Sequence, residues 1–203
     1  MVEPLRPSEN DLKNFLIGGA TVGAAFAAYK QVADLPTFAL FIVFGLTTLF
    51  FRELGQRIVA QWMESEVHTE LSKEGAVTTV IVGLLSYISV FSLAFFVPVS
   101  SSFSAPSYEH WGKGIDAIWA KRQYWLASSG IVFLLVGWAL VYSLGVSALA
   151  ELIALFTFFQ LLPLDKEKKI TGKLDGAYIL LWTGFTWLIF MGLTVIMMVL
   201  SVL

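Results

Sequence analysis

The sequence predicts an all-α, polytopic membrane protein with about six transmembrane helices. Its 203 residues are 57% hydrophobic and only 14% charged, whereas soluble domains carry roughly 25% charged residues. Six segments also approach the roughly 20 mainly apolar residues that a bilayer-spanning helix needs. A formal net charge of −2 and the absence of cysteine give no basis for nucleic-acid binding, disulfides or thiolate metal sites. We therefore expect one membrane domain over residues 1–203.

The six expected spans follow one another along the chain. Ser8 and Asp11 suit the N-cap and the N3 acid of the first span, over residues 12–29. The second, over residues 36–62, runs apolar to Phe51 and continues through FRELGQRIVAQW without a helix breaker. The remaining apolar runs are residues 76–97, 124–142, 146–163 and 177–203, the last being longer than one span needs.

Two polar connections separate the later spans. Residues 98–123 include Ile115, Ile118 and Trp119, which suit a short helix lying in the interface. Residues 165–175 read DKEKKITGKLD and form a charged break. With six spans both termini share one side, which carries five basic residues against eight on the other. The positive-inside rule then favours external termini in a multi-pass protein of the cell membrane.

Small residues follow one face of the first expected helix. Gly19, Gly23 and Ala27 fall at i, i+4 and i+8, a spacing that lets two helix backbones approach closely in lipid. We expect this stripe to pack within the chain, with contact to another integral membrane subunit as the alternative.

Three isolated residues carry possible chemistry. His68 and His110 both lie in polar connections, and two scattered histidines do not supply the three or four ligands of a zinc site. Glu151 lies near one end of the fifth span, where it is either a functional acid within the membrane or a side chain that reaches the interface. The sequence leaves both readings of Glu151 open.

The segment FFRELGQRIVAQW, residues 50–62, contains a more specific pattern. Arg52, Glu53 and Gln56 share a helix face. In H-E-x-x-H this spacing places two histidines on one zinc ion, with the glutamate as general base. Arginine has no lone pair to offer a metal, and Gln56 is a weak oxygen ligand. These residues therefore predict neither a zinc site nor a catalytic residue.

Two later motifs follow this helix in order. Residues 159–163 read FQLLP, and residues 174–176 read LDG. Together with RELGQ, they resemble the site-2 protease family of intramembrane zinc metalloproteases, in its small archaeal-type form. That family has H-E-x-x-H, an aromatic-N-L-L-P run and L-D-G, whose aspartate is the third zinc ligand. The resemblance implies a site-2-protease-like core.

The departures from the family pattern all affect positions that the family uses for its metal site and its motifs. Both histidine positions are changed, the asparagine is Gln160, and residues 130–134 lack the family's Pro and Asn. Eleven residues, six of them charged, separate Pro163 from Asp175, and we expect this polar stretch to carry Asp175 away from the site. The resemblance thus implies a non-catalytic pseudoprotease. Its vestigial positions are Arg52, Glu53, Gln56, Gln160 and Asp175.

Loss of a metal dication would leave Glu53 and Asp175 as uncompensated acids near a membrane core, which is unfavourable. We expect Arg52 to take over part of the structural role of the cation by pairing with Glu53 or Asp175, and Gln56 to bond neighbouring polar groups. The alternative is that Arg52 extends to the lipid headgroups.

Three classes of function remain. The leading one is a structural or accessory subunit of a larger membrane complex, which contacts lipid and other integral subunits and needs no cofactor. An archaeal membrane monooxygenase such as ammonia monooxygenase is one candidate complex, although no residue identifies it. The second class is an atypical intramembrane protease that uses Glu53 and Asp175 in a wet cavity. The third is a small transporter or channel, which predicts an internal repeat relating spans 1–3 to spans 4–6.

Overall fold

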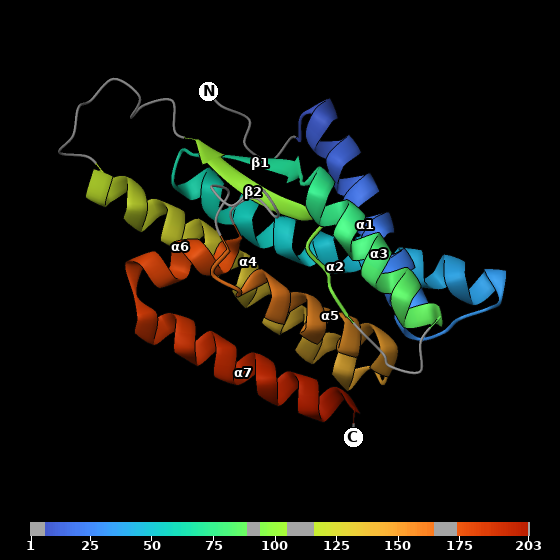
Figure 1. Cartoon of the computed structure of the whole chain (residues 1–203). Coiled ribbons are helices and arrows are strands. Elements are labelled where there is room, and N and C mark those ends of the chain that lie inside the picture. The colour runs from blue at the N-terminus through green and yellow to red at the C-terminus, as the bar shows by residue number, and fades with distance from the viewer. Residues whose placement is uncertain (1–6, 89–93, 105–115, 165–173, 203) are drawn as a thin grey trace.

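The computed structural model of the chain describes residues 7–88, 94–104, 116–164 and 174–202. These residues form seven α-helices and one antiparallel strand pair (Figure 1). The mostly helical architecture is confirmed, whereas the expectation of an all-α fold is corrected by the two strands. In chain order the elements are α1 (Glu9–Tyr29), α2 (Leu35–Trp62), β1 (Glu66–Leu71), α3 (Lys73–Ile88), β2 (Val99–Ser104), α4 (Asp116–Ser143), α5 (Ser147–Gln160), α6 (Asp175–Trp182) and α7 (Gly184–Val202).

Helix α1 begins at the capping box that the sequence indicates. The hydroxyl of Ser8 accepts a hydrogen bond from the Asp11 backbone N–H at 3.1 Å, and the Asp11 carboxylate accepts one from the Ser8 backbone N–H at 3.0 Å. Reciprocal bonds of this kind satisfy donors that the first helical turn leaves unpaired. The start of α1 is therefore fixed by two side chains, one of which, Asp11, also contributes to the polar site described below.

Helices α1 and α2 touch backbone to backbone. A Cβ added to Gly23 would lie 2.3 Å from the Phe41 carbonyl oxygen, and one added to Gly45 would lie 2.2 Å from the Gly19 carbonyl oxygen. Only glycine fits such an approach. Ala27 is fully buried in the same core. The small-residue stripe of α1 is thus used for packing within the chain.

Both strands lie outside the expected spans: β1 (Glu66–Leu71) between the second and third of them, and β2 (Val99–Ser104) in the expected polar connection 98–123. Strands β1 and β2 pair in antiparallel register, from Glu66 opposite Ser104 to Leu71 opposite Val99. Thr69 links the sheet to α1, because its N–H donates to the Asp11 carboxylate at 2.9 Å. Figure 1 shows both strands on one side of α2, with α7 on the opposite side of the molecule.

Several expected span boundaries are wrong. Residues 94–97 are not helical and lead into β2, so the expected span 76–97 does not continue to its end. The expected last span is divided at Thr183, whose backbone is extended, with φ −154° and ψ 114°. Residues 116–123 belong to α4 and not to a separate interfacial helix. The remainder of that expected helix, at Ile115, lies outside the described residues.

Three helices within the described residues are long and apolar enough to cross a membrane: Leu35–Trp62, Ile118–Ser143 and Gly184–Val202. Helix α7 buries only Thr194, Met197 and Ser201 and otherwise exposes a large apolar surface. Such a surface suits contact with lipid hydrocarbon. The helices therefore support a multi-pass membrane protein, with three candidate spans by length and composition in place of six. Helix α5, with 14 residues, is about 21 Å long and shorter than a bilayer core of roughly 30 Å.

Candidate functional site

The start of α6 packs closely against the end of α5, and Asp175 is fully buried there. Asp175 is the first residue of α6, and Gly176 follows it so closely against α5 that an added Cβ would lie 2.0 Å from the Leu161 carbonyl oxygen. The Leu174 N–H also donates to the Leu164 carbonyl at 3.1 Å. These contacts hold the first residues of α6 against the residues at the end of α5. The expectation that this connection would carry Asp175 away from α2 is therefore wrong.

Arg52 and Asp175 form a buried, two-bond ion pair. The Nε of Arg52 donates to Oδ2 of Asp175 at 2.7 Å, and Nη2 donates to Oδ1 at 2.9 Å. Both side chains have an exposed fraction of 0%. The parallel bonds match the planar guanidinium to the carboxylate and fix their relative orientation. Arg52 therefore joins α2 to α6 and does not extend to the headgroups.

Gln56 connects the ion pair to the strands. Its amide nitrogen donates to Oδ1 of Asp175 at 3.0 Å, and its amide oxygen accepts a hydrogen bond from the Ser101 hydroxyl in β2 at 2.8 Å. On the other side, a Cβ added to Gly130 of α4 would lie 2.9 Å from the Gln56 amide nitrogen. The side chain is held from three directions and is fully buried.

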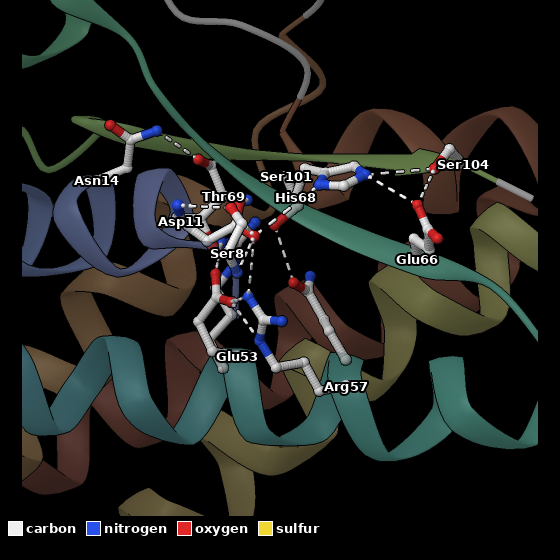
Figure 2. Close-up of polar contacts among 12 residues, drawn as sticks. Ser8, Asp11, Asn14, Glu53, Arg57, Glu66, His68, Thr69, Ser101 and Ser104 are labelled. Carbon is white, nitrogen blue, oxygen red and sulfur yellow. Dashed lines mark hydrogen bonds and ion pairs between the residues drawn. The ribbon is translucent and has the colours of Figure 1, made fainter. Parts of the chain in front are cut away.

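A row of alternating charges continues from Arg52 along α2 to α1. Arg52 Nη1 lies 3.8 Å from Oε1 of Glu53, and Arg57 Nη2 lies 3.3 Å from Oε2 of the same carboxyl group. Arg57 Nη2 also lies 4.0 Å from Oδ2 of Asp11. Figure 2 shows Asp11, Glu53 and Arg57 drawn together beneath the strand that carries Thr69. The row thus runs Asp175, Arg52, Glu53, Arg57, Asp11.

The outer end of the row stays ionised to lower pH than a free aspartate. Burial by itself raises the pKa of the Asp11 carboxyl. The hydrogen bonds from Ser8 and Thr69 and the positive charge of Arg57 outweigh burial and leave this pKa below its ordinary value of 3.8. Asp11 therefore contributes stability at neutral pH that is lost only as the pH falls through this lowered pKa.

The residues at the resembled zinc position do not fit a zinc ion. Arg52 offers five N–H donors and no lone pair, and it engages both oxygens of Asp175. Gln56 turns its amide nitrogen, a donor, toward the same carboxylate. Among the described residues, no group of three or more His, Asp or Glu side chains is arranged to hold a metal ion. The donor set suits an arginine–carboxylate pair.

The other predicted residues lie apart from the ion pair. Gln160 donates to the Val99 carbonyl at 3.4 Å, while its buried side-chain oxygen has no hydrogen-bond partner within the described ranges. Glu151 pairs with Lys30 at the end of α1, so it is neither unpaired in the membrane nor directed to bulk water. His68 is half exposed and lies 3.4 Å from Glu66. His110 lies outside the described residues.

Sequence reasoning missed two contributors to this network, Arg57 and Ser101, and also missed Lys30 as the partner of Glu151. The spacing of Arg57 four residues after Glu53 is a detectable signal, since such pairs face each other on a helix. Lys30 and Ser101 gave no comparable signal, because their partners lie 121 and 45 residues away in the chain. Their roles depend on tertiary packing.

Comparisons of the chain with protein-family models, with curated proteins and with solved structures found no match.

Proposed function

We propose that this chain is a non-catalytic, multi-pass membrane protein that serves as a structural or accessory subunit of a larger membrane assembly. The observation that carries the proposal is the fully buried pair of Arg52 and Asp175. A guanidinium stands where the resemblance to the site-2 protease family implies the metal. Its hydrogen bonds to Asp175 connect α2 to α6, and the hydrogen bond from Ser101 to Gln56 connects α2 to β2.

The same contacts argue against proteolysis by Glu53 and Asp175. An acid pair that activates water needs a shared wet space and one shared proton. Here both oxygens of Asp175 accept hydrogen bonds from Arg52, and the remaining terminal nitrogen of that guanidinium lies 3.8 Å from Glu53. The guanidinium of Arg52 thus lies between the two carboxyl groups, so they do not face each other across one shared water.

The family resemblance and the loss of the metal can be tested together by restoring the two missing ligands. The Arg52→His, Gln56→His variant would present two histidines one helical turn apart, with Asp175 facing them. We expect about one zinc per chain in this variant, because three such ligands suffice for a zinc site with one open position. Inductively coupled plasma mass spectrometry after dialysis measures the zinc.

The matched controls keep one ligand missing. The wild type and the Arg52→His, Gln56→Leu variant are expected to retain far less than one zinc per chain, since each lacks at least one ligand. Stoichiometric zinc in the wild type, together with cleavage of a membrane-embedded peptide that is lost in Glu53→Gln, would refute the non-catalytic assignment.

We further propose that α1, α3 and α5 complete six passes of the membrane with α2, α4 and α7, the bilayer being locally thinner at the short α5 and both termini lying outside. The chain has no cysteine, so single cysteines are clean reporters of topology. Cysteines at Gln31 and at Ser8 should label on opposite sides of an intact cell membrane with a charged, impermeant maleimide. Labelling of both from the same side would contradict six passes.

The subunit proposal itself is tested by purification from the native source in mild detergent. We expect the chain to migrate with other integral membrane proteins at fixed stoichiometry, and the Arg52→Met variant to be lost from that assembly. A wild-type chain that migrates alone as a stable monomer would contradict the subunit proposal while leaving the zinc experiment unaffected.

A further inference from the structure

Helices α4 and α7 run in the same direction and are joined near both ends (Figure 1). Near their starts, the Tyr124 hydroxyl donates to the Thr186 hydroxyl at 3.4 Å. Near their ends, Nε1 of Trp138 donates to the Ser201 hydroxyl at 2.8 Å. Both helices are candidate membrane spans. The two contacts therefore show which residues of α4 and α7 lie at the same depth.

The exposed residues of α4 change character in a fixed order along the helix. Lys121 is exposed, and Trp125 follows one turn later on the same face with an exposed fraction of 47%. The exposed residues that continue this face are aliphatic: Val132, Val136 and Leu140. Tyr142, at the end of the helix, is 43% exposed. A charge, an aromatic ring, aliphatic side chains and a second aromatic ring are the order in which a helix meets headgroups, interface, hydrocarbon and far interface.

The junction of α6 and α7 repeats the first part of this order. Trp182, the last residue of α6, is 42% exposed. Its ring centroid lies 6.3 Å from that of Tyr124, which in turn lies 5.3 Å from the ring centroid of Trp125. Beyond this point the exposed face of α7 is apolar from Phe185 to Val202. Tyr124, Trp125 and Trp182 therefore form one group of rings, the aromatic collar, where α4 and α7 begin.

The length of the apolar part of each helix matches the thickness of a bilayer. Tyr142 follows Trp125 by 17 positions, which is about 26 Å along an α-helix. Helix α7 has 19 residues and is about 28 Å long. The hydrocarbon core of a bilayer is roughly 30 Å thick. Both helices can therefore cross it with the collar at one surface and with little mismatch.

From these observations we infer that the aromatic collar binds the headgroup and glycerol region of one leaflet and sets the depth of the chain in the bilayer. The amphipathic rings of tryptophan and tyrosine prefer this boundary. The ammonium of Lys121 extends outward to the lipid phosphates, and the hydrocarbon begins below Trp125. The inference rests on the proposed membrane location. It places residues 118–123 outside the hydrocarbon, although they belong to the candidate span Ile118–Ser143.

The collar also gives the depth of the buried ion pair. A Cβ added to Gly130 would lie 2.9 Å from the Gln56 amide nitrogen, and one added to Gly137 would lie 2.7 Å from Cγ of Phe51. Arg52 lies between Phe51 and Gln56 on α2, and so between the levels of the two glycines. Those levels are about 8 Å and 18 Å from the collar along α4. The ion pair is therefore placed in the interior of the membrane, below the reach of the headgroups.

Depth measurements with single spin labels test the inference. The chain has no cysteine, so one cysteine at a time is introduced into the full chain, which is labelled in phosphatidylcholine vesicles. Power-saturation electron paramagnetic resonance compares access of oxygen and of a polar nickel chelate. Labels at Trp125 and Trp182 should lie at the headgroup boundary and agree within about one helical turn, 5 Å, while a label at Val136 should lie deep. A larger difference between the two collar positions, or a label at Trp125 as deep as that at Val136, would overturn the inference.

A label at Gly192 separates the collar from the proposed membrane location. Gly192 is exposed on α7 and nothing lies within 4 Å of its added Cβ, so a label fits there. If Gly192 is shielded from nickel while the collar positions are not at the boundary, the collar alone is overturned. Equal access of nickel to Gly192 and to Lys121 would contradict the membrane location and the collar together.

Leucine substitutions test whether the rings hold the chain at this depth. Ile118 is exposed two turns before Trp125 and carries the label. In the Trp125→Leu, Trp182→Leu variant this label should sink by about 3 Å, the rise of two residues, because leucine enters hydrocarbon whereas indole prefers the boundary. The matched control is Phe185→Leu, which replaces an exposed ring that has no polar atom and should leave the label in place. An unchanged depth in the double variant would overturn the anchoring role of the collar.

Discussion

Two ion pairs join distant segments of this chain, and they differ in almost every physical respect. Arg52 and Asp175 are 0% exposed, share two hydrogen bonds and are supported by Gln56. Lys30 and Glu151 share one contact, and their side chains are 35% and 11% exposed, so only the lysine is open to water. The sequence separations are nearly equal, at 123 and 121 residues. The difference lies in solvent access, which decides whether water can replace a lost partner.

The comparison explains why a buried charge pair can fix an arrangement without adding much to overall stability. Removing two ions from water is expensive, and their attraction in a buried site offsets that penalty only when the geometry is good and the remaining atoms are bonded. An exposed pair avoids most of the penalty and gains little. We therefore expect the Arg52 pair to be sensitive to removal of one partner and the Lys30 pair to tolerate it.

The largest effect is expected at Arg52. Arg52→Met removes the guanidinium and leaves Asp175 as an uncompensated buried charge, so the free energy of unfolding should fall by about 3–5 kcal/mol. Titration with sodium dodecyl sulfate in mixed micelles, followed by circular dichroism, measures it. A loss below about 1 kcal/mol, the level of exposed pairs, would show that the Arg52–Asp175 pair is no more important to stability than the Lys30–Glu151 pair.

The next effect is expected at Gly176, which positions Asp175. An added Cβ would lie 2.0 Å from the Leu161 carbonyl oxygen, so Gly176→Ala must displace α6 from α5 and should cost up to about 3 kcal/mol in the same titration. Gly192 is the matched control, because nothing lies within 4 Å of its added Cβ. Gly192→Ala should be neutral or slightly stabilising. Equal losses in the two variants would argue against tight packing at Gly176.

A smaller effect is expected at Gln56. Gln56→Leu keeps the side-chain volume but removes a donor to Asp175 and leaves the Ser101 hydroxyl without its acceptor. We expect a loss of about 1–2 kcal/mol, since the bidentate bonds of Arg52 remain. Gln56→Glu sharpens the test, because it adds a second carboxylate beside Asp175. It should be less stable than Gln56→Leu at neutral pH and should recover as the pH is lowered.

The smallest effect is expected at the ion pair of Lys30 and Glu151. Lys30→Met keeps an apolar side chain but removes the ammonium, which pairs with Glu151 and lies 5.7 Å and 5.5 Å from the ring centroids of Phe26 and Tyr29. The unfolding free energy should change by about 1 kcal/mol, less than at Arg52, because Lys30 is partly exposed and Glu151 keeps its hydrogen bond with the Tyr29 side chain. Thermal unfolding at low and high salt checks this, and a loss as large as that of Arg52→Met would contradict the proposed role of solvent access.

The sequence was informative where local pattern decides structure. The first two helices end at Tyr29 and Trp62 as predicted, and the capping box of Ser8 starts the first of them. The strand pair was not predictable in this way, because VSSSFS has little strand character and the paired residues of the two strands lie 28 to 38 positions apart. The break at Thr183 was missed because Thr183 and Gly184 interrupt the apolar run only briefly, and glycine is common within transmembrane helices.

The ion pair shows the same limit at the level of a site. The helical spacing of Arg52, Glu53 and Gln56 places three polar side chains on one face, which the sequence reveals directly. The partner of Arg52 was left open, because Glu53 is adjacent in sequence while Asp175 depends on the close approach of α6 to α5. That approach depends on the absence of a Cβ at Gly176 and on the hydrogen bond from the Leu174 N–H to the Leu164 carbonyl. The sequence shows the glycine but does not show which segment packs against it.

The most direct test of the account is a double-mutant cycle between Arg52 and Asp175. Unfolding free energies are measured for the wild type, Arg52→Met, Asp175→Leu and the double variant in the same micelles. Each single change should be costly, and the double variant should recover much of the loss, giving a coupling energy of at least about 2 kcal/mol. Losses that add within about 0.5 kcal/mol would contradict the claim that this pair is the structural joint between α2 and α6.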